Sequence, residues 1–245
     1  MHPLDPVRVE LFEVIKMKLK ALSCFMCTLL MVAVLCGCRS GGDKETGIDP
    51  SLAAELVEMC ALDQQMEMIA VNGSDEDRTK EFYEKKQNIQ DNHAARCKQI
   101  FEQIGYPGSD KVGAEASEAF WLLVQHSDSD PVFQERVAEA MILEVERGTA
   151  SGAKLAYLTD RVRTNTGRKQ VYGTQLDFDL ESARAMPKPI EHPRGVDERR
   201  EAVGLEPLWV YMNDTSLMHY EMNKEQYKSI GIQSAWVYEE GYLGW

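Results

Sequence analysis

The strongest constraint on the fold lies in the middle of the chain, where every residue from Ala119 to Val124 is apolar. Glu115 and Glu118 precede this run, and carboxylates are favoured in the first turns of a helix because they face the positive end of its macrodipole. Six consecutive helical residues cover the whole circumference of a helix, so this segment is expected to be enclosed on all sides. The sequence therefore predicts a central core helix.

The C-terminal end of this helix is the place where chemistry is most expected. Gln125 and His126 follow the apolar run, Asp128 comes shortly after, and Asp130 with Pro131 signals the start of the next helix. The negative end of the macrodipole favours an imidazolium at His126. This residue is therefore expected to serve better as a cation or general acid than as a general base.

The residues before the central helix show apolar positions at helical spacing. One helix is predicted from Ser51 and a second from Glu76 to the stop at Gly105, with Asn72-Gly73 between them. These two helices are expected to form an antiparallel hairpin. His93 is interpreted as a surface residue of the second helix rather than a metal ligand.

Three further helices are predicted, at residues 131–147, 153–166 and 196–203. Asp160 is expected to point away from the apolar face of its helix. Alternation of apolar and acidic residues predicts a short extended or β segment near residues 170–180. The fold class is therefore mainly α: a compact multi-helix domain with a long N-terminal helical hairpin and this one short segment.

The N-terminal region resembles the signal peptide of a bacterial lipoprotein. After Met17, which is an alternative start of translation, two lysines precede an apolar run at 21–35, and the lipobox-like sequence ends at Cys38. The alternative is a transmembrane anchor, which needs about 20 apolar residues. This run is shorter and is interrupted by Ser23 and Thr28, so Cys38 is expected to be the lipidated first residue of the mature protein.

The chain therefore divides into four parts: a signal peptide at 1–37, a flexible tether at 38–50, a helical domain at 51–210, and a C-terminal extension at 211–245 that is rich in Tyr and Trp. The extension is expected to pack back over the domain. The mature protein is expected outside the cytoplasm, anchored in the outer membrane and facing the periplasm, because Arg39 is not the Asp that retains lipoproteins in the inner membrane.

The charge of the mature chain limits its partners. The 37 residues before Cys38 contain three acids and four bases, which leaves 37 acidic and 23 basic residues and a net charge of −14. Such a surface repels phosphate backbones and anionic headgroups. Nucleic acid is therefore excluded as a partner, and association with the membrane is expected to come from the acyl chains on Cys38.

Removal of the signal peptide also changes the use of cysteine. Cys24 and Cys27 have redox-motif spacing but lie in the discarded segment, and Cys38 is lipidated. Cys60 and Cys97 remain, one on each helix of the predicted hairpin. They are expected to face one another and to form a disulfide; the alternative is two buried free thiols.

The sequence contains none of the common catalytic fingerprints: no zincin motif, no nucleophile elbow, no Walker loop and no dinucleotide fingerprint. Ser151 and Lys154 match the S-x-x-K pattern, but its companion elements are missing, so the match is attributed to chance. No metal site and no cofactor are predicted.

Several blocks of sequence resemble the bacterial domain-of-unknown-function family 6624 over roughly Leu52 to Leu208. These blocks are Gly105-Tyr106-Pro107, Ala119 to His126, Ala156 to Val162, Gln170 to Gln175 and Val196 to Leu205. Asp63-Gln64 is similar to the family's early D-Q pair, but the Arg usually found soon after it is replaced here by Glu67 or Met68. The resemblance implies a mostly helical fold and no established reaction.

We therefore predict that His126, Asp128, Arg161, Tyr172 and Gln175 form one cluster with a pocket for a small anionic or carbonyl-bearing ligand. Two functions fit this cluster. The first is a lipid-anchored envelope protein that works as a binding or accessory module. The second is a hydrolase or transferase on a cell-envelope substrate that uses His126 and Arg161. If the cluster is closed and fully paired, its role is structural.

Overall fold

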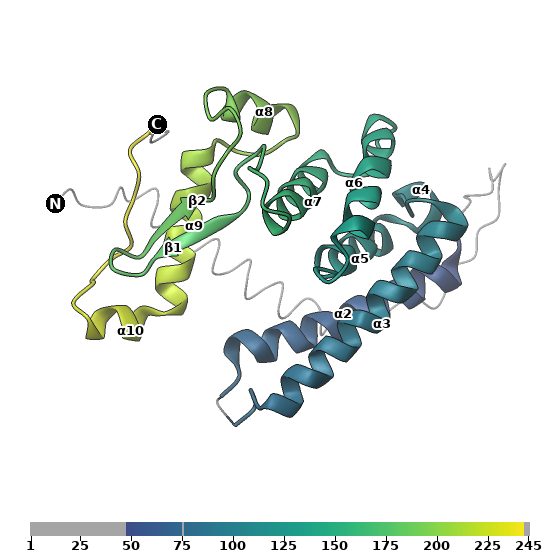
Figure 1. The fold of residues 1–245 in the computed structure, drawn as a ribbon, viewed down its shortest axis with the longest axis horizontal. Coiled ribbons are helices and arrows are strands. Elements are labelled where there is room, and N and C mark those ends of the chain that lie inside the picture. Colours follow the sequence, from purple (N-terminus) through teal and green to yellow (C-terminus); the bar gives the residue numbers. More distant parts are fainter. Residues whose placement is uncertain (1–47, 75, 243–245) are drawn as a thin grey trace, which may run out of the picture. The chain divides into compact units, whose positions relative to one another are not determined.

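The structure, a computed structural model, describes residues 48–74 and 76–242 (Figure 1). The described residues belong to a single compact unit. Its elements in chain order are α2 (Pro50–Asn72), α3 (Lys80–Ile104), α4 (Ser109–Val112), α5 (Ala114–Gln125), α6 (Pro131–Glu146), α7 (Gly152–Asn165), β1 (Leu176–Asp179), β2 (Arg184–Pro187), α8 (Val196–Ala202), α9 (Leu208–Met222) and α10 (Lys224–Ser229).

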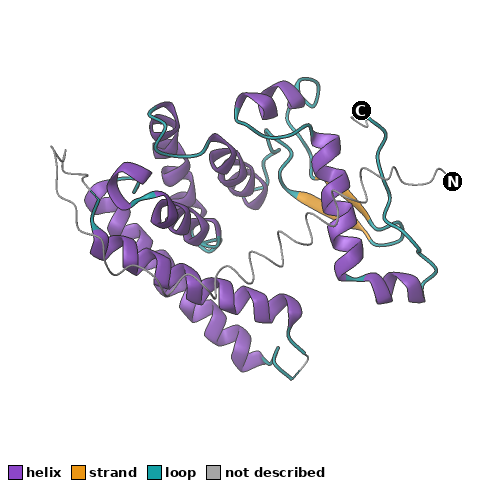
Figure 2. Cartoon of the chain, turned by 180° about the vertical axis from the view of Figure 1, so that it is seen from behind, coloured by secondary structure: helices purple, strands orange, loops and turns teal. Residues whose placement is uncertain are grey.

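This described part of the chain is mainly helical, as the sequence predicts, with one small two-stranded sheet (Figure 2). Among residues 48–242, no helix combines the length and the apolar character that a membrane span requires. The predicted signal peptide, Cys38 and most of the tether lie outside the described residues.

Helices α2 and α3 form the predicted antiparallel hairpin. Arg96 donates two hydrogen bonds to Glu55, and Gln90 donates one to Glu67, so later residues of α3 face earlier residues of α2. The cap of α2 is Asp49, whose carboxylate accepts hydrogen bonds from two backbone N–H groups of the first turn. Helix α3 starts later than predicted, at Lys80; ahead of it, Ser74 donates two hydrogen bonds to the carboxylate of Asp77.

The central helix α5 packs against α2, α3, α4, α6 and α7. Its apolar run is less completely enclosed than predicted. Ala119, Phe120, Leu123 and Val124 are buried, whereas Trp121 and Leu122 are only half-buried. The indole N–H of Trp121 donates to the carbonyl of Lys154 on α7, which satisfies the polar end of this large side chain.

The predicted extended segment is one strand of a hairpin whose second strand was missed. Strand β1 pairs antiparallel with β2, with Leu176 opposite Pro187. The turn between them places Ala183 at φ 51°, a conformation uncommon for a residue other than glycine, and Ala183 is fully buried. No Gly or Asn signals this turn in the sequence, which explains why β2 was not predicted.

The last residues pack back onto the domain, as expected for the C-terminal extension. Helix α9 begins at Leu208 and continues across residue 211, so the helical domain and the extension share one helix. The side chain of Asn213 hydrogen-bonds both the N–H and the carbonyl of Tyr238, and the Tyr238 hydroxyl donates to the Ala185 carbonyl in β2. These contacts join α9, the sheet and the C-terminal segment.

Two expectations about side chains of the hairpin are wrong. Cys60 and Cys97 are free thiols rather than a disulfide: both pack in the main apolar core as small hydrophobic side chains. Burial raises the pKa of Cys97 to about 12 and that of Cys60 to about 11, so neither forms a thiolate readily. His93 is buried rather than exposed, because α3 turns this face towards the core.

Asp160 has a role that the sequence did not predict: it is completely buried and organises the loop between α7 and β1. Its carboxylate accepts hydrogen bonds from the backbone N–H groups of Val171, Tyr172 and Thr174 and from the Thr174 hydroxyl, at 2.7 to 3.1 Å. A buried carboxylate is stable only when it is paired or hydrogen-bonded in this way. Sequence periodicity could not reveal this role, because the donors are backbone groups.

Asp160→Asn is expected to lower the free energy of unfolding by about 2 to 4 kcal/mol, because the amide replaces an acceptor with a donor that faces buried N–H groups. Urea unfolding measures the change. The matched control is Asp177→Asn, since the Asp177 side chain is 66% exposed, and it should change stability by less than about 0.5 kcal/mol. Equal effects of the two variants would contradict the role assigned to Asp160.

Candidate functional site

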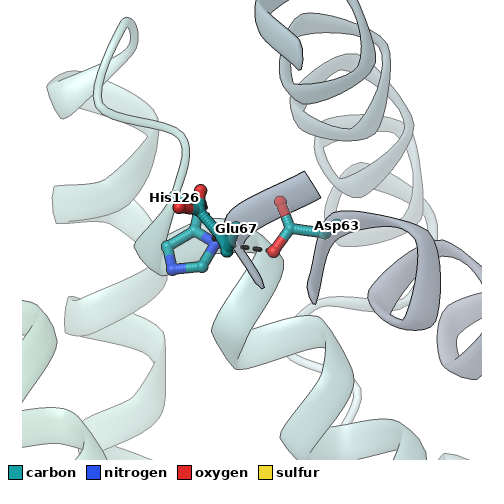
Figure 3. Close-up of side chains that lie close together, drawn as sticks. All are labelled: Asp63, Glu67 and His126. Carbon is teal, nitrogen blue, oxygen red and sulfur yellow. Dashed lines mark hydrogen bonds and ion pairs between the residues drawn. The ribbon is translucent and has the colours of Figure 1, made fainter. Parts of the chain in front are cut away.

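The site begins on α2, where Asp63 and Glu67 lie four residues apart and therefore on the same face of the helix. This helix packs against α5, whose C-cap is His126. The imidazole Nδ1 lies 2.7 Å from Oδ2 of Asp63 and 4.0 Å from Oε1 of Glu67 (Figure 3). Ligand atoms of these three residues all lie within 4.8 Å of one another, so together they could hold a metal ion.

Asp63 is the buried member of this group, with 2% of its surface exposed. Its Oδ2 faces His126 and also accepts a hydrogen bond from the amide of Gln64 at 3.2 Å. Burial of a carboxylate without such partners would be costly. The contact with Asp63 orients the imidazole, whose side chain remains 20% exposed. This arrangement resembles the pairing by which a carboxylate positions a histidine for proton transfer.

Glu67 is held from the other side by α3. Lys86 lies 2.8 Å from its Oε1, and the amide of Gln90 donates to the same oxygen at 3.0 Å. The carboxylate therefore lies between one cation and the imidazole of His126. Glu67 is the more accessible of the two acids, with 30% of its side chain exposed against 2% for Asp63.

His93 lies on α3 in the same region. Burial lowers its pKa, and the negative charge of Asp63 acts in the opposite direction. Only 9% of its surface is exposed, and its Nδ1 has no hydrogen-bond partner. A buried polar atom without a partner is uncommon in folded proteins and needs an explanation.

Asp128 and Arg161 are brought together, as predicted, but they bind each other. Arg161 donates from Nε and Nη2 to the two oxygens of Asp128 at 2.7 and 2.6 Å. Asn165 and Gln134 donate to the same carboxylate. Gln134 is fully buried and also donates to two carbonyls at the end of α5. This network fixes the loop that follows His126.

Tyr172 and Gln175 lie in the loop that Asp160 organises. The backbone N–H of Tyr172 donates to Asp160, and its carbonyl accepts from the buried Arg200. The side chain of Gln170 hydrogen-bonds the backbone N–H and carbonyl of Gln175. Gly173 between them has φ 75°, and a Cβ there would lie 2.9 Å from a Leu208 methyl group. The hydrogen bonds of this loop therefore join its family-like block to two others, through Asp160 and Arg200.

The five predicted residues therefore fall into three groups: His126 with Asp63 and Glu67, Asp128 with Arg161, and Tyr172 with Gln175. Within the described chain, the hydrogen bonds of the first group run to α2 and not to Asp128. The sequence contained the signal for the missed partner, because Asp63 belongs to the D-Q pair of the family resemblance. What sequence alone could not supply was the packing of α2 against the end of α5.

The S-x-x-K match has a structural explanation. The Ser151 hydroxyl caps α7 by accepting a hydrogen bond from the backbone N–H of Lys154. The Lys154 amine is held by Glu118 and lies over the Trp121 ring, 5.0 Å from its centroid. The amine is thus directed away from the activation of a serine nucleophile.

A cavity of about 540 Å³ lies between α2 and the start of α5. Its lining consists mainly of small apolar residues, among them Ala53, Val57 and Ala116, together with Glu58 and Glu115. None of the residues discussed above as a polar site lines it. The polar site and this apolar cavity therefore occupy different parts of the contact between α2 and α5.

Comparison with known proteins places most of the described domain in one family. The model of a family described as a family of unknown function, DUF6624, matches residues 50–219. No curated protein and no solved structure matches the chain. The matched residues include α2, α5 and α7, which carry Asp63, His126 and Arg161.

The Asp128–Arg161 pair predicts a dependence of stability on pH. Burial alone would raise the pKa of Asp128, but the hydrogen bond and charge of Arg161, with the donors Gln134 and Asn165, hold it below the ordinary value of 3.8. A lowered folded-state pKa contributes stability that is complete above the unfolded value and disappears as the pH falls through the folded value. Asp128→Asn should therefore be less stable than the wild type at pH 7, by up to about 1 kcal/mol, because solvent screens this half-exposed ion pair.

Chemical denaturation of both proteins across the acid range measures this difference, which should shrink below pH 3.8 as Asp128 itself becomes protonated. Asp177→Asn provides the control, because the Asp177 carboxylate is exposed and its ion pair with Lys188 is long, at 3.6 Å. If Asp128→Asn lowers the free energy of unfolding by the same amount at neutral and acid pH, then the shape of the side chain and not its charge stabilises the loop.

Proposed function

The chain belongs to the DUF6624 family, and we propose that it is a lipid-anchored protein of the cell envelope that works as a binding or accessory module. Acyl chains on Cys38 hold it at the outer membrane, with the helical domain facing the periplasm. The lipobox-like end of the apolar run at 21–35 supports the anchor. The net negative charge of the mature chain supports a location set by lipid rather than by attraction to anionic headgroups.

The observation that carries the binding function is the Asp63–His126 pair. Arg161 is occupied by Asp128, and the backbone of the loop at 170–175 is bonded to Asp160, Gln170 and Arg200. His126 is partly exposed and has a buried carboxylate behind it. It is the group best placed to contact a small anionic or carbonyl-bearing ligand from outside the domain.

The same pair supports a second function, a hydrolase or transferase on a cell-envelope substrate. A carboxylate on Nδ1 fixes the orientation of an imidazole and leaves Nε2 to exchange a proton with a substrate. In this second function Arg161 has a positioning role rather than a substrate-binding one, because Asp128 already occupies two of its nitrogens. The binding module remains the first proposal, since no nucleophile is paired with His126 among the described residues.

The anchor is tested by metabolic labelling with a radioactive fatty acid. The wild-type protein should carry label and sediment with membranes, whereas Cys38→Ser should lose both properties because it lacks the acylated thiol. Cys24→Ser is the matched control, because this cysteine lies in the segment expected to be removed. Label that persists in Cys38→Ser would exclude the proposed anchor.

The site is tested by complementation of a deletion strain. His126→Gln should fail to restore the wild-type phenotype while it retains the unfolding midpoint to within a few degrees, because Gln can still donate a hydrogen bond to Asp63. His192→Ala is the control, since the His192 side chain is 86% exposed. Full complementation by His126→Gln would contradict a functional role for this histidine. If both His126→Gln and Arg161→Ala unfold the protein, these two residues have a structural role instead.

A further inference from the structure

The Asp63, Glu67 and His126 group offers one nitrogen and two carboxylate donors from two helices, aimed at one point. Imidazole together with carboxylate is a donor set suited to divalent first-row transition metals, whereas calcium and magnesium prefer oxygen donors alone. We propose that these three residues bind a divalent transition-metal ion of the zinc type, whose fourth coordination position stays open. This inference rests on the binding function proposed above and names the ligand of that module.

The distances in the group fit this assignment after small side-chain movements. Two donors that lie about 2.0 to 2.2 Å from the same tetrahedral ion are roughly 3.3 Å from each other. Nδ1 of His126 lies 2.7 Å from Asp63 and 4.0 Å from Glu67, so the first contact would open and the second would close by less than 1 Å each. The ion would replace the proton that joins Nδ1 to Asp63.

Charge gives a second reason for a cation. Asp63 and Glu67 make this region acidic, and Lys86 is the cation within contact of Glu67. A small anionic ligand would be repelled from such a site unless a positive charge were placed there. A bound divalent ion with an open coordination position would provide that charge and would bind a carboxylate or carbonyl oxygen directly.

Gln64 would not bind the ion itself but would orient one of its ligands. Its amide donates to Oδ2 of Asp63, the oxygen that faces His126. Partners of this kind orient a metal-binding carboxylate, and their loss commonly weakens binding about 10- to 100-fold. Lys86 would act in the opposite direction, because it competes with the ion for Oε1 of Glu67. The site thus contains one residue whose removal should weaken metal binding and one whose removal should strengthen it.

The test is titration of Zn²⁺ into the chelator-treated full chain in detergent, followed by isothermal calorimetry. One equivalent should bind, and Asp63→Asn or His126→Gln should weaken binding by more than about tenfold. Lys86→Gln should strengthen it, because Lys86 competes for the same oxygen of Glu67. His192→Ala, a variant of an exposed histidine 3.9 Å from Glu191, should bind as the wild type does. Mg²⁺ should not compete at equal concentration.

Cobalt substitution separates this site from the two thiols of the hairpin. Co²⁺ bound by His and carboxylate should give no thiolate charge-transfer band, and Cys60→Ser should leave Zn²⁺ affinity unchanged. Binding that disappears in Cys60→Ser but persists in Asp63→Asn would overturn the proposal, and so would the absence of Zn²⁺ uptake by the folded wild type. Fatty-acid labelling and His126→Gln complementation do not depend on added metal, so failure here is distinguishable from failure of the proposed function.

Discussion

The packing of α5 against five other helices is the constraint on which the rest of the described structure depends. Because α5 lies among α2, α3, α4, α6 and α7, its C-terminal end reaches the surface at one defined place. His126 caps that end, and Asp63 on α2 meets it at 2.7 Å. A polar site at this position is therefore a result of core packing: apolar contacts along α5 determine where a histidine can meet a carboxylate.

The buried carboxylates of Asp160 and Asp63 have different kinds of hydrogen-bond partner. Asp160 is satisfied mainly by backbone donors of its loop. Asp63 is nearly as buried, but its partners are the side chains of Gln64 and His126. Backbone donors are fixed by the course of the loop, whereas side-chain partners can adopt other rotamers. The two carboxylates therefore differ in how far their hydrogen-bond partners are fixed by the backbone.

The sequence predicted the helices well, because hydrophobic periodicity and the Gly and Pro signals at their ends are local properties. It placed Arg161 beside Asp128 and His126 at a helix end. It did not reveal that His126 pairs with Asp63, that Asp160 is buried, or that β2 forms a hairpin with β1. Each of these depends on contacts between distant segments or on backbone donors that side-chain patterns do not encode. The predicted disulfide failed because the two cysteines are not equidistant from the turn: Cys60 lies 12 positions before Asn72, whereas Cys97 lies 24 positions after Gly73.

The two free thiols of the hairpin affect how its helices are held together. Cys60 and Cys97 contribute to the core as apolar groups, and no covalent cross-link joins the helices within the described residues. The two helices of this hairpin are therefore held together by noncovalent contacts, to which each thiol contributes the packing of a small apolar group.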